Sequence, residues 1–129
     1  MMRNIFGAAL LLIAFTHSAV ANENGVPRAL LTELREAAET CNMEAMVNLI
    51  VPYLRPSTDE ETMRMATQEC LQGSGKELAI ALTLAADMRP EYHTDGLLAI
   101  YNLSGFDLPF KKRGLKFVKY DGVWYFMSR

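Results

Sequence analysis

The sequence predicts an α+β domain in which the helices come first and an antiparallel sheet comes last. In the first half of the chain, apolar residues recur at three- and four-residue spacing, which is the period of helices. In the second half, short β-rich runs are separated by turn residues, and an Asp-Gly pair joins the last two runs. Such a pair is the strongest short signal for a β-hairpin. We therefore expect N-terminal helices to pack on a C-terminal β-meander.

Residues 1–21 have the pattern of a cleavable secretory signal peptide. Arg3 precedes an apolar run over 5–15, and the segment 19–21 (Ala-Val-Ala) carries the small residues of a cleavage site. The run is far shorter than the roughly 20 residues that span a bilayer, although an uncleaved anchor is the alternative. We expect a single α+β domain over 22–129, no stable membrane insertion after cleavage, and a periplasmic or secreted location.

Two helices are expected before residue 52. Pro27 suits the first turn of a helix, and Asn42 is a good N-cap for a second helix that ends between Pro52 and Pro56. The apolar stripe of the first helix consists of Leu30, Leu31, Leu34, Ala37, Ala38 and Cys41.

A third helix is expected to start in the segment 57–61. Ser57 and Thr58 each have a glutamate three residues later, as in a capping box, and the acidic residues favour the positive end of the helix dipole. The glycines of the segment 73–75 are expected to end this helix. The segment 76–87 fits either a strand or a helix, and its four alanines favour a helix.

The chain has two cysteines, Cys41 and Cys70, and both follow the predicted cleavage site. An even count in an exported domain favours a disulfide. A bridge closing this loop would contribute roughly 3–4 kcal/mol in the chain-entropy model. Two buried free thiols or a reactive thiol are the alternatives, and the spacing is not that of a CxxC redox motif.

Strands are predicted over 88–93, 97–103, 113–120 and 123–127, with Pro90 placing the first at an edge. The two-residue turn at 121–122 sets the register of the last hairpin. The expected opposite pairs are Tyr120 with Val123, Val118 with Tyr125, Phe117 with Phe126, and Lys116 with Met127. Both faces of this hairpin are apolar near the turn, so the sheet is expected to have cover on both sides or a pocket on one.

Two segments resemble a known family. The segment CNMEAMVNLI resembles a helix opening, and the ending LKFVKYDGVWYFM resembles the terminal hairpin, of NTF2-like domains of the cystatin-like superfamily. The resemblance implies helices against a curved, cone-like sheet, here possessing fewer strands. That superfamily includes pocket enzymes and noncatalytic binding domains, so the fold selects neither.

The resemblance also directs attention to polar residues that could line such a cone, because enzymes of the superfamily use an acidic residue with a Tyr or His there. The candidates are Tyr101, Asp107, Tyr120, Tyr125 and His93. Tyrosines in strands are also common packing residues. His93, which Tyr92 and Asp95 flank, could serve as an acid–base group or lie in a polar turn.

Lys111, Lys112, Arg113 and Lys116 form the basic cluster of the sequence. It could contact an anionic ligand or an acidic partner, or it could be a solvated strand face. Nucleic acid is not expected, because the whole chain has a net charge of −2, which becomes −3 without Arg3.

No catalytic motif, metal site or cofactor site is predicted. The leading hypothesis is a small exported, noncatalytic domain that binds a small ligand or an unknown envelope protein. A homodimer formed through the sheet is one form of such an interaction. The alternative hypothesis is a small NTF2-like pocket enzyme of isomerase or lyase type.

Overall fold

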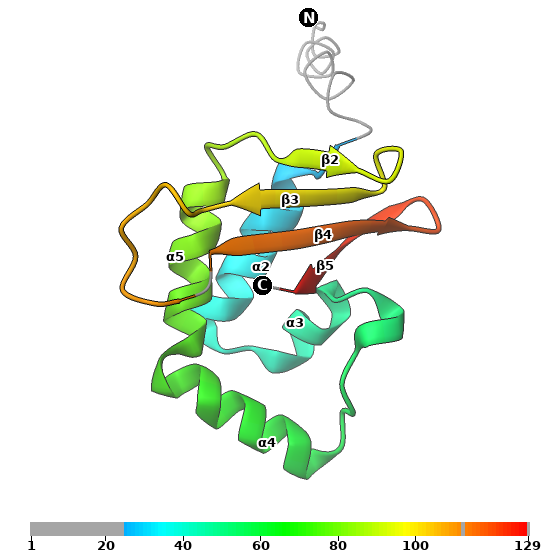
Figure 1. Ribbon diagram of the computed structural model, residues 1–129. Helices are drawn as coiled ribbons and strands as arrows, with labels where there is room; N and C mark the ends of the chain where they lie inside the picture. Colours follow the sequence, from blue (N-terminus) through cyan, green and yellow to red (C-terminus); the bar gives the residue numbers. More distant parts are fainter. Residues whose placement is uncertain (1–24, 112, 129) are drawn as a thin grey trace, which may run out of the picture.

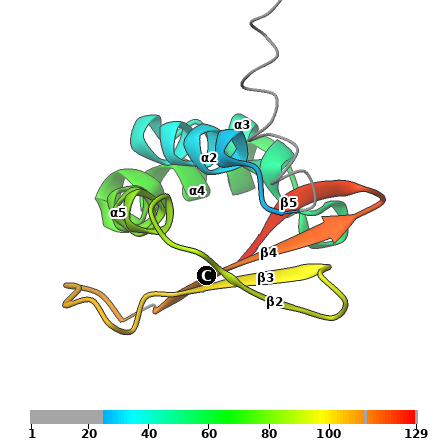
Figure 2. The same ribbon diagram turned by 90° about the horizontal axis from the view of Figure 1, so that it is seen from above.

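The computed structural model of the protein describes residues 25–111 and 113–128. Helices form one layer and an antiparallel sheet forms the other (Figures 1 and 2). The helices precede the strands along the chain, which confirms the predicted α+β order. The predicted signal peptide and Lys112 lie outside the described residues. Within that part of the chain, no helix has the length and apolar character needed to cross a membrane.

The first two helices start where the sequence predicts. Helix α2 (Arg28–Thr40) follows Pro27 and buries its apolar stripe. Helix α3 (Met43–Leu49) follows Asn42, whose side-chain oxygen accepts a hydrogen bond from the backbone N–H of Ala45 at 3.1 Å. A short 3-10 helix, η1 (Pro52–Leu54), comes next.

The predicted cap of the third helix is wrong by one or two residues. Helix α4 (Glu60–Glu69) begins after Asp59, whose carboxylate accepts a hydrogen bond from the backbone N–H of Thr62 at 2.8 Å. The hydroxyl of Ser57 donates to the Asp59 carboxylate instead of capping the helix. A charged oxygen is the stronger acceptor here, because it also meets the positive end of the helix dipole. None of the residues of α4 is fully buried.

The glycine segment turns the chain, as predicted, between two helices. Residues Cys70–Ser74 (η2) form a wide turn in which Gly73 has φ of 143°, a conformation that favours glycine. Helix α5 (Gly75–Ala85) follows, so the ambiguous segment 76–87 is mostly helical.

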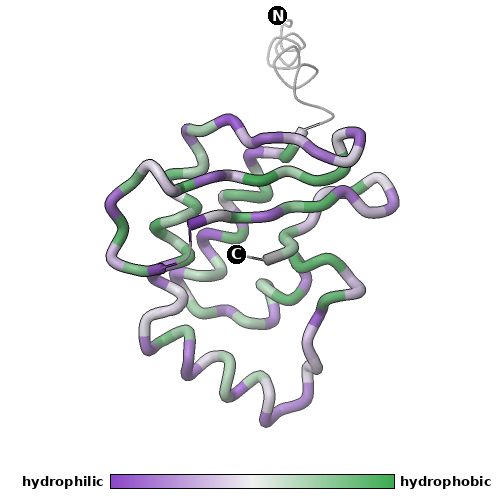
Figure 3. The backbone as a smooth tube through the Cα atoms, in the orientation of Figure 1, coloured by the Kyte–Doolittle hydropathy of each residue, from purple (hydrophilic) through white to green (hydrophobic). Residues whose placement is uncertain are grey.

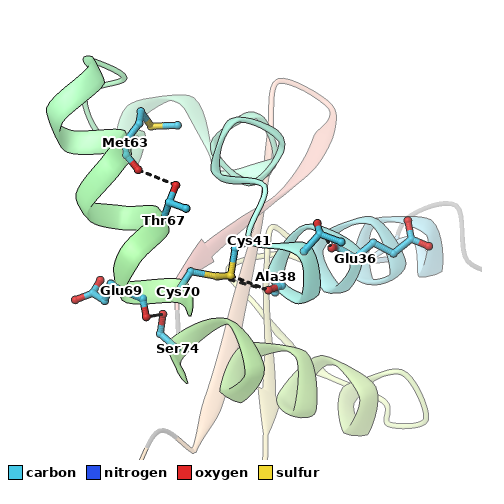
Figure 4. Close-up of a disulfide and its surroundings, with 9 residues drawn as sticks. Glu36, Ala38, Cys41, Met63, Thr67, Glu69, Cys70 and Ser74 are labelled. Carbon is cyan, nitrogen blue, oxygen red and sulfur yellow. Dashed lines mark hydrogen bonds between the residues drawn. A yellow bond between two sulfur atoms is a disulfide. The ribbon is translucent and has the colours of Figure 1, made fainter. Parts of the chain in front are cut away.

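The predicted disulfide is present between Cys41 and Cys70, with 5.8 Å between their Cα atoms. It links the end of α2 to the turn after α4, and both sulfur atoms lie against the carbonyl oxygen of Ala38, at 3.7 Å and 3.5 Å (Figure 4). Gly75 fits beside it, because a Cβ there would lie 2.3 Å from the Cys70 sulfur. An intramolecular disulfide is consistent with an oxidising compartment outside the cytoplasm.

The sheet contains strands β2 (Glu91–His93), β3 (Leu98–Asn102), β4 (Gly114–Tyr120) and β5 (Val123–Ser128). They are antiparallel in the order β2-β3-β4-β5, so the predicted meander is confirmed. Asp121 and Gly122 both have positive φ, 53° and 80°, as a tight type I′ hairpin turn requires.

Most of the predicted hairpin register is confirmed. The observed pairs include Tyr120 with Val123, Val118 with Tyr125, and Phe117 with Phe126. The pairing of Lys116 with Met127 is wrong, because Lys116 lies opposite Ser128. Met127 is an extra residue in β5 at this point, which is a β-bulge, and a turn-based register cannot anticipate it.

The core lies between α2, α5 and one face of the sheet, which we call the inner face. The inner face contributes the buried residues Ala99, Tyr101, Leu115, Phe117, Trp124 and Phe126. Because side chains alternate along a strand, Leu115 and Phe117 of β4 are buried while Lys116 between them is exposed, and the colours of β4 change accordingly (Figure 3). Helices α2 and α5 therefore cover one face of the sheet, and the other face points away from them (Figure 2).

Candidate functional site: the outer face of the sheet

The face of the sheet that points away from α2 and α5 is the outer face (Figure 2). The strand register defines it, because residues paired across antiparallel strands point to the same side. It carries His93, Leu98, Val118 and Tyr125 in one row, Glu91, Ile100 and Lys116 in a second, and Tyr120 with Val123 beside the hairpin turn. None of these side chains is fully buried, although most are apolar or aromatic.

An aromatic group lies at the hairpin end of the outer face. The ring of Tyr53, from η1, meets the ring of Tyr120 edge-on, with 5.4 Å between the centroids. Tyr120 also contacts Tyr125, at 6.5 Å. The guanidinium of Arg55 lies over the ring of Tyr125, 5.8 Å from its centroid. We call these four residues the tyrosine cluster.

Backbone contacts hold the arginine of this cluster in place. Arg55 donates one hydrogen bond to the carbonyl oxygen of Ile50 at 2.9 Å and another to that of Asn48 at 3.1 Å. The Tyr53 and Tyr120 side chains remain open to solvent, with exposed fractions of 57% and 44%. The cluster thus offers flat aromatic surface whose arginine is already held in place, so little side-chain conformational entropy would be lost on binding. Residues of this kind dominate the binding energy of protein interfaces.

Charged residues lie at opposite ends of the strands. The two hairpin turns place Asp95 and Asp121 at one end, where β2 joins β3 and β4 joins β5 (Figure 1). The long loop before β4 and the first residues of β4 place Lys111, Arg113 and Lys116 at the other end. The described residues of the predicted basic cluster therefore lie at the end of the strands opposite the two turn aspartates, although Arg55 lies near the hairpin end and Glu91 in the row of Lys116.

His93, the histidine candidate, is exposed on β2 at the edge of the sheet. Its Nε2 atom lies 3.5 Å from a carboxylate oxygen of Glu91, and not beside Asp95, which follows it in sequence. It borders no pocket among those the structure describes. Asp107 is likewise exposed, in the loop between β3 and β4.

Tyr101 lies on the opposite face of the sheet from the other two tyrosine candidates, Tyr120 and Tyr125. It lies on the inner face, 3% exposed, with its ring edge-on to that of Phe117 at a centroid distance of 5.6 Å. Burial, with a smaller contribution from nearby Tyr92, raises the pKa of the Tyr101 hydroxyl to about 12. The shift is away from physiological pH, at which a tyrosine phenol is already neutral.

The structure thus brings together Tyr120, Tyr125, Lys116 and His93 on the outer face, and it places Tyr101 on the other side of the same sheet. Sequence reasoning missed Tyr53 and Arg55, which reach the hairpin from a segment more than sixty residues earlier in the chain. A usable signal existed: an aromatic and an arginine stand between Pro52 and Pro56, where the chain cannot continue a helix.

The core of the described part of the chain consists of apolar and aromatic residues. Its buried residues include no charged side chain, and no three His, Cys, Asp or Glu side chains converge there as a metal site. Comparisons of the chain with protein families, with curated proteins and with solved structures found no match.

Proposed function

We propose that this chain is a small exported, noncatalytic binding domain that docks a protein on the outer face of its sheet. The tyrosine cluster is the observation that carries the proposal: two exposed tyrosine rings, a half-buried third ring and an arginine held by backbone contacts lie at the face that points away from α2 and α5. Tyr and Arg are the residue types enriched where protein interfaces gain most of their free energy.

The filled core supports binding at the surface. Phe117 is completely buried, and Trp124 and Phe126 are each 6% exposed, so aromatic rings fill the middle of the space between helices and sheet. A pocket enzyme needs a cavity with a carboxylate and an orienting Tyr or His. The open pocket that Tyr101 borders has neither a carboxylate nor a histidine among the described residues that line it. The NTF2-like enzyme is therefore the weaker alternative. We retain the NTF2-like relationship itself as a proposal about ancestry, based on 41–50 and the terminal hairpin.

The occupant we propose for the outer face is a second copy of the chain. Asp95 and Asp121 lie at one end of the face, near Arg55, and Lys111 and Lys116 lie at the other end, with Glu91 in the row of Lys116. A second copy turned end for end would set the turn aspartates against the lysines, while the apolar rows between them meet. Such a two-fold arrangement uses one patch twice, as most soluble dimers do.

Sedimentation equilibrium of the purified protein tests this occupant. We expect a reversible dimer that Tyr120→Ser weakens by at least tenfold, because the ring lies in the proposed contact. Leu71→Ser is the matched control, since Leu71 is 72% exposed on the helical side and its loss should leave association unchanged. A protein that stays monomeric at millimolar concentration would overturn the proposal that a second copy binds the outer face.

A charge exchange sharpens the test. One variant carries Asp95→Lys with Asp121→Lys, and the other carries Lys111→Glu with Lys116→Glu. Each alone brings like charges together and should lose the dimer, whereas an equimolar mixture should form a heterodimer. Both turn aspartates have positive φ, so thermal unfolding is recorded to show that each variant is folded.

Cross-linking in the cell separates a second copy from another protein. A photoreactive amino acid at position 120 should give an adduct of twice the chain mass, and one at position 71 should not. An adduct with a different protein at position 120 keeps the outer face as the docking site and replaces the occupant. Adducts from position 71 alone would contradict the proposal.

A further inference from the structure

A second candidate site lies on the inner-face side of the sheet, where the first turn of α2, the end of α5 and strand β2 meet. An open pocket of about 700 Å³ is present there. Its volume is within the range of small-molecule sites. It is bordered by segments around Val26, Met88 and Tyr101, which are far apart in the sequence.

The pocket has apolar walls and cationic groups. Leu31, Met88, Pro90 and the ring of Tyr101 supply the apolar surface, and Arg28 and Arg89 supply positive charge. None of the described residues that line it is acidic. In a chain with a net charge of −2, this gives a local concentration of positive charge.

The two arginines differ in what they already contact. Arg28 donates to the carbonyl oxygen of Ala86 at 3.0 Å and lies 3.8 Å from the carboxylate of Asp87. The guanidinium of Arg89 has no hydrogen bond or ion pair in the part of the chain that the structure describes. The N–H groups of the Arg89 guanidinium are thus available to an anion. A carboxylate suits this planar group, because its two oxygens can accept two parallel hydrogen bonds.

The polar groups beside Arg89 suit the same ligand. The Tyr92 hydroxyl already accepts a hydrogen bond from the backbone N–H of Val26 at 3.2 Å, so it closes one wall. The Tyr101 hydroxyl makes no hydrogen bond with another described residue. A tyrosine phenol is neutral at physiological pH, so this hydroxyl is a donor that a carboxylate could accept from.

We propose that this pocket binds a small organic carboxylate with an apolar body, the carboxylate on Arg89 and Tyr101 and the body against Leu31, Met88 and Pro90. The proposal is independent of docking at the outer face. It assigns the pocket a class of ligand for which both the carboxylate and the apolar body contribute to binding.

The test titrates the purified protein, produced from the full-length chain, with benzoate and with the neutral analogue benzyl alcohol, while amide signals are followed by NMR. Benzoate should give saturable shifts at Val26, Gly96 and Tyr101, and benzyl alcohol should bind at least tenfold more weakly, because a hydrogen bond to a charged group is lost. Equal affinity for the two compounds would overturn the carboxylate class.

Variants locate the carboxylate. Arg89→Gln should weaken benzoate binding about tenfold or more, and Tyr101→Phe should weaken it by a smaller factor. Arg64→Gln is the matched control, since Arg64 lies on α4 and pairs with Glu61, away from the pocket. Unchanged affinity in Arg89→Gln, or shifts confined to residues that do not border the pocket, would overturn the proposal.

Discussion

The inner and outer faces of the sheet are built from the same strands, and they differ in the chemistry of their aromatic residues. Phe117 and Phe126 on the inner face are buried against helices, whereas Tyr120 on the outer face is 44% exposed. Phenylalanine has no polar atom to satisfy in a core, and tyrosine carries a hydroxyl that keeps contact with water. Tyr101, which is 3% exposed on the inner face, shows that residue type alone does not separate the two faces. The strand register assigns each side chain to a face, and the helices that cover the inner face account for the burial of its aromatic rings.

The largest expected effect comes from truncating the inner face. Phe117→Ala removes a ring that is completely buried and leaves a cavity, so it should lower the free energy of unfolding by about 3–5 kcal/mol. Val118→Ala, the next residue on the same strand but on the outer face, should cost about 1 kcal/mol or less. Urea denaturation of both variants measures the difference. Equal losses would show that the outer face is packed as tightly as the inner one.

The second prediction loosens the helical layer that covers the inner face. Replacing both cysteines with serine opens a loop whose ends are 29 residues apart and should cost about 2–4 kcal/mol. Thermal unfolding of this variant should match that of the parent protein under a reductant. A parent that is insensitive to reductant would contradict the expected contribution of the bridge.

The third prediction concerns the packing beside the same bridge. In Gly75→Ala, the new Cβ would lie 2.5 Å from the carbonyl oxygen of Ala38, which is backbone and cannot swing away. Overpacking should outweigh the helix propensity of alanine and cost about 1–3 kcal/mol. Gly105→Ala is the matched control, because nothing lies within 4 Å of its Cβ, and its unfolding free energy should change by about 0.5 kcal/mol at most.

The smallest effect is a pH response confined to α4, which has no fully buried residue. Hydrogen bonds from the Ser57 hydroxyl, and then from Thr62, lower the pKa of Asp59 to about 2, from an ordinary value of 3.8. A depressed carboxyl pKa stabilises the fold above the unfolded value, so this contribution is complete above about pH 4 and disappears as the pH falls towards 2.

Carboxyl NMR titration measures this value directly. Ser57→Ala should raise the pKa of Asp59, because it removes the largest cause of the shift. The signals of β4 should not change over the same pH range, since the cap lies on a helix outside the core. An Asp59 midpoint near 3.8 in the parent would contradict the observed cap geometry.

Local chemistry explains what the sequence could predict. The Asp-Gly turn determines both φ signs and hence the pairing of Phe117 with Phe126, and Asn42 determines where α3 begins. These features depend on neighbours within a few residues. The disulfide prediction also succeeded, because the chain has only two cysteines and leaves a single pairing to test.

The remaining features depend on contacts between distant segments. The bulge at Met127 arises where β5 meets the end of β4, and Tyr53 reaches Tyr120 only because η1 folds against the hairpin. Arg89 lines an open pocket that separate elements border. No periodicity within one segment reports such meetings, so the sequence named half of the tyrosine cluster and, of the pocket, only Tyr101.

One edge of the sheet is partly closed by the chain itself. Ile50 forms a parallel bridge with Phe126, and the backbone N–H of Val51 donates to the Phe126 carbonyl oxygen at 3.0 Å. At the opposite edge, β2 is three residues long. Copies of the chain therefore have little free backbone on which to add strand to strand, which disfavours open-ended, amyloid-like growth. If contact between copies is restricted to a face, assembly stops at a closed pair and does not extend into a fibre.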